Sequence, residues 1–195
     1  MKADVKEIIK LGSILLIVSV ISAVLLSIAD GLTQGPIMAQ RETASRLARQ
    51  AVLKEATKFE KLDATLMDLM KENQPRLVDV HIGYAGTEQV GLVIKTTPGG
   101  YGGDIEVTTG VNMDGKISGV RIGTHLETPG LGAKAKEDPE FYEQFNGMNA
   151  RKTINVSKVK RDENQIIAIS GATITSDAVT EGVNLAANVY IKLLE

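Results

Sequence analysis

The sequence predicts an α+β fold, a twisted antiparallel sheet with packed helices, preceded by one N-terminal transmembrane helix. Three observations lead to this prediction. Residues 11–29 contain no charged side chain. Residues 78–124 contain short β-rich runs separated by glycine-containing turns, as strands of a sheet do. Residues 176–194 repeat apolar side chains every three or four positions, which is typical of an amphipathic helix.

Residues 11–29 have the length and composition of a membrane span. Of these 19 residues 12 are Leu, Ile or Val. As a helix they would extend about 28 Å, close to the roughly 30 Å hydrocarbon core of a bilayer. The alternative is a cleaved signal peptide with residues 27–29 as the cleavage site. We expect a retained anchor, because a signal peptide usually has only about 7–15 apolar residues.

The charges beside the span predict its orientation. Lys2, Lys6 and Lys10 precede it, and no Lys or Arg follows it until Arg41. Because cytoplasmic flanks carry the excess of basic residues, we expect residues 1–10 to lie in the cytoplasm. The chain would then be a single-pass protein of the cell (inner) membrane with an extracytoplasmic C-terminal part.

Residues 30–72 are expected to form spacer helices between the membrane and the globular domain. Two glycines and a proline in residues 31–36 predict a break. Residues 37–61 are rich in helix formers, with apolar positions three and four apart, and residues 64–71 predict a second short helix. The extracytoplasmic domain is therefore placed at residues 73–195.

The domain begins with predicted strands. Residues 78–82 alternate between apolar and polar side chains, and residues 89–96 form another β-rich run. Residues 104–111 and 116–124 are expected to pair, because Asp114-Gly115 between them is typical of a tight hairpin turn.

The second half of the domain mixes helix and strand. Residues 132–145 predict helix, and residues 153–159 and 165–169 predict short strands. The final helix is predicted at residues 176–194.

The composition excludes several kinds of site. The chain has no cysteine, which excludes disulfides, thiolate zinc sites and protein-ligated iron–sulfur clusters. The net charge of −2 gives no reason to expect a nucleic-acid partner. His81 and His125 have no neighbour at metal-ligand spacing, so we expect no metal site.

Residues 170–176, Ser-Gly-Ala-Thr-Ile-Thr-Ser, connect the strand predicted at 165–169 to the final helix. Gly171 and Ala172 keep the backbone bare, and three hydroxyls follow within four residues. The start of a helix presents unpaired N–H groups and the positive end of its dipole, which suits a phosphate. The alternative is that these hydroxyls are ordinary helix caps.

Two further loops carry unusual residues. Four glycines surround Tyr101 in residues 99–103. They form either a flexible hairpin tip or a place where the backbone can approach a flat ligand. In residues 124–132, Pro129-Gly130 predicts a tight turn that aims the Thr128 hydroxyl and neighbouring N–H groups in one direction.

His125 and Glu127 in the second loop are candidates for a general acid and base. Two titratable groups on such a loop are more often hydrogen-bond partners within the fold. We expect that structural role for both.

These segments resemble those of one known family. Residues 170–175 are similar to the flavinylation motif of the G subunit of the Rnf complex, and of its relative, the C subunit of the sodium-pumping NADH:quinone oxidoreductase. Gly-Tyr-Gly-Gly at 100–103 and His-x-Glu-Thr-Pro-Gly-Leu-Gly at 125–132 are similar to further segments of this family, in the same order. Related motifs usually have an aspartate where this chain has Ile167.

The resemblance implies a covalent cofactor. In this family a flavin transferase joins FMN, through its phosphate, to the last threonine of the motif, which is Thr175 here. It implies that 73–195 is an FMN-binding domain whose other residues contact the phosphate, the ribityl chain or the flavin ring. These residues are Ser170, Gly171, Ala172 and Thr173 for the phosphate and ribityl chain, and Thr128, Leu131, Gly132, Glu127 and Tyr101 around the ring.

The resemblance also implies a function. The chain would be a membrane-anchored redox subunit that relays electrons in an Rnf-type complex, which couples ferredoxin:NAD⁺ electron transfer to Na⁺ or H⁺ translocation. Other membrane and peripheral subunits and the flavin transferase would be its partners. Because it lacks cysteine and a glycine-rich dinucleotide fingerprint, we expect it to bind neither ferredoxin nor NAD itself. It would have no complete active site alone.

Three alternatives stay open at this point. The chain could be the C-type subunit of the quinone-linked relative. It could be an anchored scaffold or ligand-binding domain without redox activity. It could also hold FMN non-covalently and serve as a sensor.

Overall fold

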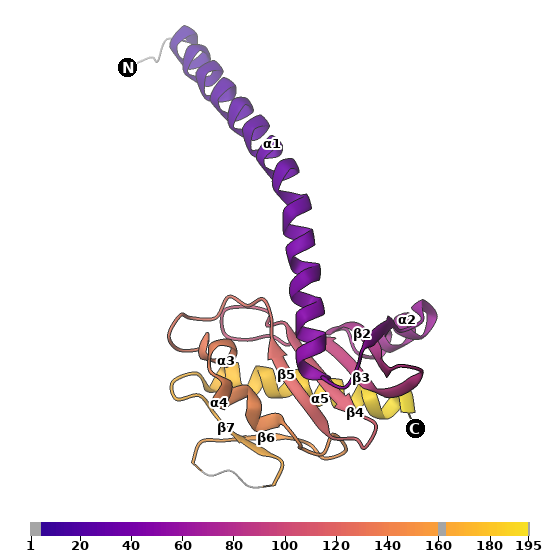
Figure 1. Ribbon diagram of the computed structural model, residues 1–195. Helices are drawn as coiled ribbons and strands as arrows, with labels where there is room; N and C mark the ends of the chain where they lie inside the picture. Colours follow the sequence, from indigo (N-terminus) through magenta and orange to yellow (C-terminus); the bar gives the residue numbers. More distant parts are fainter. Residues whose placement is uncertain (1–4, 160–162, 195) are drawn as a thin grey trace. The chain divides into compact units, whose positions relative to one another are not determined.

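The computed structural model describes residues 5–159 and 163–194, and Figure 1 traces their elements along the chain. Its contacts divide the chain into two compact units, Met1–Ala44 and Ser45–Glu195. Within the described residues, the first unit is helical from Val5 and the second unit holds every strand. The predicted α+β architecture behind an N-terminal helix is confirmed.

Helix α1 (Val5–Val52) carries the apolar stretch that the sequence assigns to the membrane. Within the described residues it is the one helix long and apolar enough to cross a bilayer. Its large apolar side chains between residues 8 and 28 are exposed. Since no protein core covers them, these side chains are consistent with a single-pass membrane anchor.

The break predicted at residues 31–36 is wrong, because α1 continues through Pro36. A proline inside a helix removes one backbone hydrogen bond and disturbs the preceding turn. It does not end this helix, which runs unbroken to Val52. Thr33 Oγ1 also donates a hydrogen bond to the Ala29 carbonyl at 3.0 Å, within the helix.

The second unit is built on a five-stranded antiparallel sheet in which each strand lies beside its neighbour in sequence. Its strands are β1 (Lys58–Lys61), β2 (Leu77–Ala85), β3 (Glu88–Thr96), β4 (Val107–Asn112) and β5 (Ile117–Ile122). The strands predicted from period-two patterns correspond to β2 to β5. Gly115 in the β4–β5 turn has a φ of 74°, as the predicted hairpin turn requires.

The helix predicted over 37–61 is too long at its C-terminal end. Helix α1 ends at Val52, and Lys58–Lys61 pairs with β2 as strand β1. This pairing gives the segment backbone partners, and Phe59 packs against Leu53 and Ala56. The short helix predicted next is confirmed as α2 (Ala64–Asn73), and the Asp63 side chain caps its first turn.

Helix α5 (Thr173–Leu194) covers one face of the sheet. Its side chains Val179, Val183 and Ala186 are fully buried with Ile94 and Val107 of the sheet. Three short helices complete this core, namely α3 (Lys134–Glu137), α4 (Pro139–Tyr142) and the 3₁₀ helix η1 (Glu143–Phe145). The core thereby fixes α5 against the sheet.

Strands β6 (Asn155–Ser157) and β7 (Gln165–Ile167) form a separate two-stranded sheet. They are parallel, which the sequence did not predict. Both predicted strand positions are correct, but neither period-two patterning nor a turn motif reports which strands pair or in which direction.

The last residues of α1 lie on the opposite face of the five-stranded sheet, since Val93 packs with Val52 while its neighbours on β3 face the α5 core. Ser118 Oγ donates a hydrogen bond to the Val52 carbonyl at 2.6 Å. A Cβ atom on Gly119 would lie 2.9 Å from Val52 Cα. Glycine is therefore needed where the helix backbone rests on the sheet.

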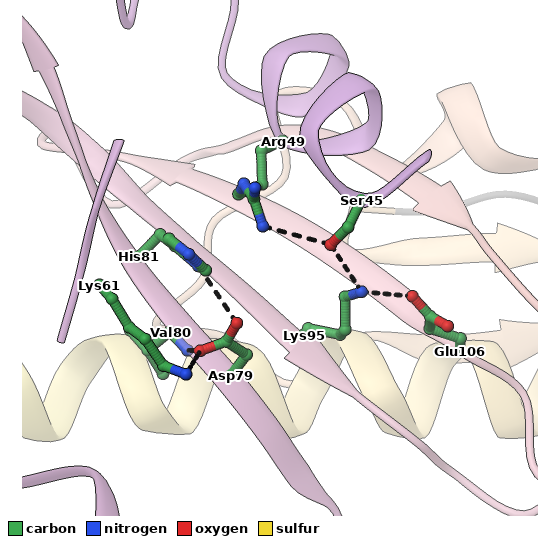
Figure 2. Close-up of polar contacts among 8 residues, drawn as sticks. All are labelled: Ser45, Arg49, Lys61, Asp79, Val80, His81, Lys95 and Glu106. Atoms are coloured by element: carbon green, nitrogen blue, oxygen red, sulfur yellow. Dashed lines mark hydrogen bonds and ion pairs between the residues drawn. The ribbon is translucent and has the colours of Figure 1, made fainter. Parts of the chain in front are cut away.

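Polar contacts also join this end of α1 to the sheet (Figure 2). Lys95 Nζ on β3 lies 2.5 Å from Glu106 Oε1 and donates to Ser45 Oγ at 2.8 Å. Arg49 Nη1 donates to the same Ser45 hydroxyl at 3.2 Å. Lys95 and Glu106 are mostly buried, so this ion pair is less screened than one at the surface.

Candidate functional site

The threonine motif lies at the start of α5. The helix begins at Thr173, three residues before its predicted start, so Thr175 is in the first turn. The amide of Ser176 donates to the Ala172 carbonyl at 3.0 Å. The amides before it, at the first three positions of the helix, have no acceptor within the helix and point toward its N-terminal end.

Ser176 connects this turn to the residues before the helix. Its Oγ accepts a hydrogen bond from the Ile169 amide at 3.0 Å and donates one to the Ala172 carbonyl at 3.0 Å. The alternative that the hydroxyls of the motif are ordinary caps does not describe Ser176, because its Oγ accepts from an amide that precedes the helix. Nor does it hold for Thr175, whose hydroxyl is bonded elsewhere.

Thr175 and Glu127 form a buried hydrogen bond. Thr175 Oγ1 donates to Glu127 Oε2 at 2.5 Å, and the two residues are 1% and 6% exposed. The other carboxylate oxygen, Oε1, accepts from the Gly102 amide at 2.9 Å. Glu127 thus joins all three segments singled out in the sequence: the glycine loop, the Thr-Pro-Gly loop and the threonine motif.

The glycines of these loops make room for the Glu127 carboxylate. A Cβ atom on Gly100 would lie 2.5 Å from Glu127 Oε1. One on Gly132 would lie 2.6 Å from Oε2 and 2.8 Å from Thr175 Oγ1. At Gly100 and Gly132 the bare backbone therefore makes room for a side chain of the same chain.

The turn predicted at Pro129-Gly130 is confirmed. Gly130 has a φ of 75°, and the Leu131 amide donates to the Thr128 carbonyl at 3.2 Å, as in a type II turn. Thr128 is exposed, and its carbonyl also accepts a hydrogen bond from Ala133. The structure thus brings Thr128 beside the site through its backbone.

His125 and Glu127 are hydrogen-bond partners within the fold, as expected. The Glu127 amide donates to His125 Nδ1 at 3.3 Å, in addition to the two bonds made by the Glu127 carboxylate.

Leu131 lies beside the start of the threonine motif. Its Cδ2 is 3.3 Å from the position that a Cβ atom on Gly171 would occupy. Ser170 and Gly171 are exposed, Thr173 is half-buried and Ala172 is buried. Leu131, which the resemblance assigns to the flavin ring, therefore lies next to Gly171, which it assigns to the phosphate and ribityl chain.

Large apolar side chains are exposed on the three segments that meet at Glu127. They are Tyr101, Leu126, Leu131 and Ile174, with exposed fractions of 71%, 77%, 45% and 56%. Exposed apolar groups mark a binding surface where they form one contiguous patch, and single ones do not. Leu126 and Ile174 were missed in the sequence, although each stands at the variable position of its motif, between two residues that were singled out.

Ile167 occupies the position at which related motifs usually have an aspartate. It lies on β7, and its amide donates to Gln144 Oε1 at 2.7 Å. Its side chain is 41% exposed and takes no part in the Thr175–Glu127 contact.

Comparisons with known proteins agree on one family. A family model described as an FMN-binding domain matches residues 100–188, a range that includes every predicted site residue. The G subunit of the Na⁺-translocating ferredoxin:NAD⁺ oxidoreductase complex of Acetobacterium woodii is 39% identical over 198 residues, which cover 97% of this chain and 95% of the relative.

Two further relatives carry similar names. The G subunit of the proton-translocating ferredoxin:NAD⁺ oxidoreductase complex of Clostridium ljungdahlii is 36% identical, covering 77% of this chain and 75% of its own. The G subunit of the ion-translocating oxidoreductase complex of Methanosarcina acetivorans is 30% identical, covering 99% of both chains.

The fold is similar to a solved structure. The crystal structure of Shewanella oneidensis NqrC superposes with a TM-score of 0.56 and 18% sequence identity, covering 77% of this chain and 94% of that one. This likeness supports the architecture of the domain.

Proposed function

Since this chain belongs to the family of G subunits of ion-translocating oxidoreductase complexes and carries an FMN-binding domain, we propose that it holds FMN covalently, as a phosphodiester on Thr175. The flavin supplies the redox chemistry when bound, and the chain binds and orients it. The subunit would then relay electrons within its complex.

The observation that carries this proposal is the position of Thr175. It lies in the first turn of α5, at the point where the three segments of the FMN-binding domain converge on Glu127. A phosphodiester keeps one negative charge, which the N-terminus of a helix stabilises by roughly 0.3–1 kcal/mol. The donor set at this turn thus fits the phosphate end of FMN.

The surroundings of Thr175 suit the rest of the cofactor. The backbone of residues 170–173 is the candidate for contacts with the phosphate and ribityl chain. Thr128, Leu131 and Gly132 are the candidates for flanking the ring, with Tyr101 and Glu127 beside them. The exposed apolar side chains on these segments offer the isoalloxazine ring a surface that excludes water.

We propose the same reaction for the complex as the names of its relatives state. The complex would transfer electrons between ferredoxin and NAD⁺ and move Na⁺ or H⁺ across the membrane. This chain would contact the other membrane and peripheral subunits. A flavin transferase would attach the cofactor.

The anchor sets the proposed location. Residues 11–29 would cross the cell membrane, with residues 1–10 in the cytoplasm, 30–72 as a spacer and 73–195 as the extracytoplasmic domain. The exposed apolar side chains of α1 and the lysines before them support this arrangement.

The test is the intact mass of the full chain purified from its native membrane. We expect the mass of the amino acids plus one FMN less one water, and a denatured gel band that fluoresces under ultraviolet light. The Thr175→Ala variant should lose both signals, whereas Thr173→Ala should keep the added mass. A native chain with no added mass, or a fluorescent Thr175→Ala band, would overturn the covalent assignment. If acid releases the flavin, and with it the colour, from the protein, FMN is bound non-covalently instead.

A further inference from the structure

The buried pair formed by Glu127 and Thr175 has a chemical consequence. The Thr175 hydroxyl donates directly to Glu127 Oε2, and Glu127 Oε1 is held by the Gly102 amide. A hydroxyl nucleophile is activated by an adjacent general base that accepts its proton, and Glu is one of the side chains that can serve as this base. Here both groups belong to the protein that is to be modified.

We propose that Glu127 is the general base for the esterification of Thr175, so that this chain supplies the group that activates its own acceptor hydroxyl. The inference rests on the proposed function, in which Thr175 carries FMN. The flavin transferase performs the reaction, and Glu127 would be a catalytic residue that the acceptor protein contributes to it.

Burial of Glu127 is costly for the fold. A carboxylate removed from water needs charged or hydrogen-bonding partners to offset the lost hydration. In the described part of the chain, no Lys, Arg or His forms an ion pair with Glu127. Its carboxylate has the Gly102 amide and the Thr175 hydroxyl as partners.

The fold does not need this pair to begin α5. Ser176 already fastens the turn to Ile169 and Ala172. Two glycines, Gly100 and Gly132, nevertheless keep the space of the carboxylate free. The pair joins the three segments, and in addition it places a carboxylate oxygen where it can accept the proton of Thr175.

The reaction balances without any redox step. A threonine hydroxyl is a weak nucleophile, so its proton must leave as the new bond forms. Thr175 Oγ1 attacks the phosphorus of a flavin nucleotide activated as a phosphoanhydride. The Oγ1–P bond forms, the anhydride P–O bond breaks, and its electron pair leaves with the second nucleotide. The proton passes from Oγ1 to Glu127 Oε2.

The start of α5 fits the incoming phosphoryl group. The helix amides before Ser176 point toward it, and helix N-termini stabilise charge on phosphoryl oxygens. Protein kinases use an Asp to accept the proton of their substrate hydroxyl in the same way. In this chain the base belongs to the protein that carries the acceptor hydroxyl.

Access to Thr175 requires a small movement. The residue is 1% exposed, and Leu131 beside Gly171 is 45% exposed. In the proposed reaction, the partly exposed Leu131 side chain rotates so that the nucleotide can approach Thr175. After the transfer, protonated Glu127 can donate to a phosphate oxygen, so neither group is left without a partner.

The test follows the added mass over time. The unmodified full chain, produced in a host without the transferase, is mixed with purified flavin transferase and flavin adenine dinucleotide. Glu127→Gln keeps the size of the side chain and an oxygen that accepts from Thr175, but it removes the basicity and the acceptor of the Gly102 amide. We expect kcat to fall about 10²–10⁴-fold with little change in KM for the chain. Glu127→Asp should keep part of the rate.

The control is Glu137→Gln, the same chemical change at an exposed position of α3, which should keep the wild-type rate. A Glu127→Gln rate within about threefold of wild type would overturn the inference, because a general base contributes far more. The proposed function would still hold after that result if the wild-type chain gains the mass of FMN less one water. Wild type that stays unmodified in the assay and in its native membrane refutes the proposed function instead.

Folding of the variants is checked by circular dichroism and thermal melting. If Glu127→Gln does not fold, Glu127→Asp decides, because its carboxylate is one methylene shorter and loses direct contact with Thr175 Oγ1. A fall in kcat of about tenfold or more at unchanged KM supports the base, and an unchanged kcat contradicts it.

Discussion

Replacing Gly132 by alanine tests whether the three segments meet as the structure has them. The new Cβ atom would lie 2.6 Å from Glu127 Oε2, 2.8 Å from Thr175 Oγ1 and 2.9 Å from Glu127 Cβ. Each distance is shorter than a relaxed carbon contact, so Glu127 or the loop must move. The hydrogen bond from Thr175 should then lengthen or break.

The magnitude follows from overpacking a buried site. Such insertions cost about 1–3 kcal/mol, and in a domain of roughly 150 residues each kcal/mol lowers Tm by about 2–4 °C. We expect Gly132→Ala to lower the Tm of the full chain by about 2–12 °C. Because the acceptor hydroxyl loses its position, the rate of flavin attachment should also fall by at least about tenfold.

Gly130→Ala is the matched control. Nothing lies within 4 Å of its Cβ position, but its φ of 75° strains an alanine by about 1–2 kcal/mol. It should therefore lower Tm by a similar amount while attachment continues. Melting followed by circular dichroism and intact mass after incubation with the transferase measure both effects. A Gly132→Ala chain with wild-type Tm and wild-type attachment would refute the geometry.

Three further predictions test other parts of the molecule. Ser176→Ala removes the acceptor of the Ile169 amide and should cost about 1–2 kcal/mol, seen as a Tm lowered by roughly 2–8 °C with the flavin still attached. Lys95→Met leaves the mostly buried Glu106 without its cation and should cost about 1–3 kcal/mol, with faster amide exchange at the end of α1; unchanged exchange there would contradict the role of this pair. Because the chain has no cysteine, Glu140→Cys should react with a membrane-impermeant maleimide in intact cells, whereas a cysteine placed ahead of the anchor should react only after permeabilisation. The reverse pattern would refute the proposed orientation.

Local patterns predicted most of the strands. The β4–β5 hairpin is an example, because two β-rich runs are joined by an Asp-Gly turn, with the Gly115 amide bonded to the Asn112 carbonyl. Such signals depend on residues close in sequence. They can therefore be recognised in the sequence without knowledge of the fold.

One prediction failed where distant contacts decide the local structure. Residues 58–61 have a composition compatible with a helix, yet they form a strand because β2 offers its edge and Phe59 finds an apolar cluster. The Gly-Pro break was overestimated because α1 tolerates Pro36. At residues 58–61 the weak local preference yields to its surroundings, whereas the residues around Pro36 are exposed and no distant contact among the described residues accounts for their helix.

The site could be predicted in parts but not as a whole. The motifs around Thr175, Thr128 and Tyr101 are each visible in the sequence. Their junction is not, because the bond from Thr175 to Glu127 spans 48 positions and the bond from Gly102 to Glu127 spans 25. Glu127 could be assigned a hydrogen-bonding role, but no periodicity identifies its partners.

The sheet explains how the domain can hold a flavin in a fixed position. The end of α1 is bonded to one face through Ser118 and Lys95, and α5 is packed on the other through its buried valines. Thr175 is part of α5 itself, two residues from its start, and is not on a free loop. A cofactor attached there moves with the sheet. Since the rate of electron transfer depends steeply on distance, attachment to this helix favours a relay with constant spacing to its partners.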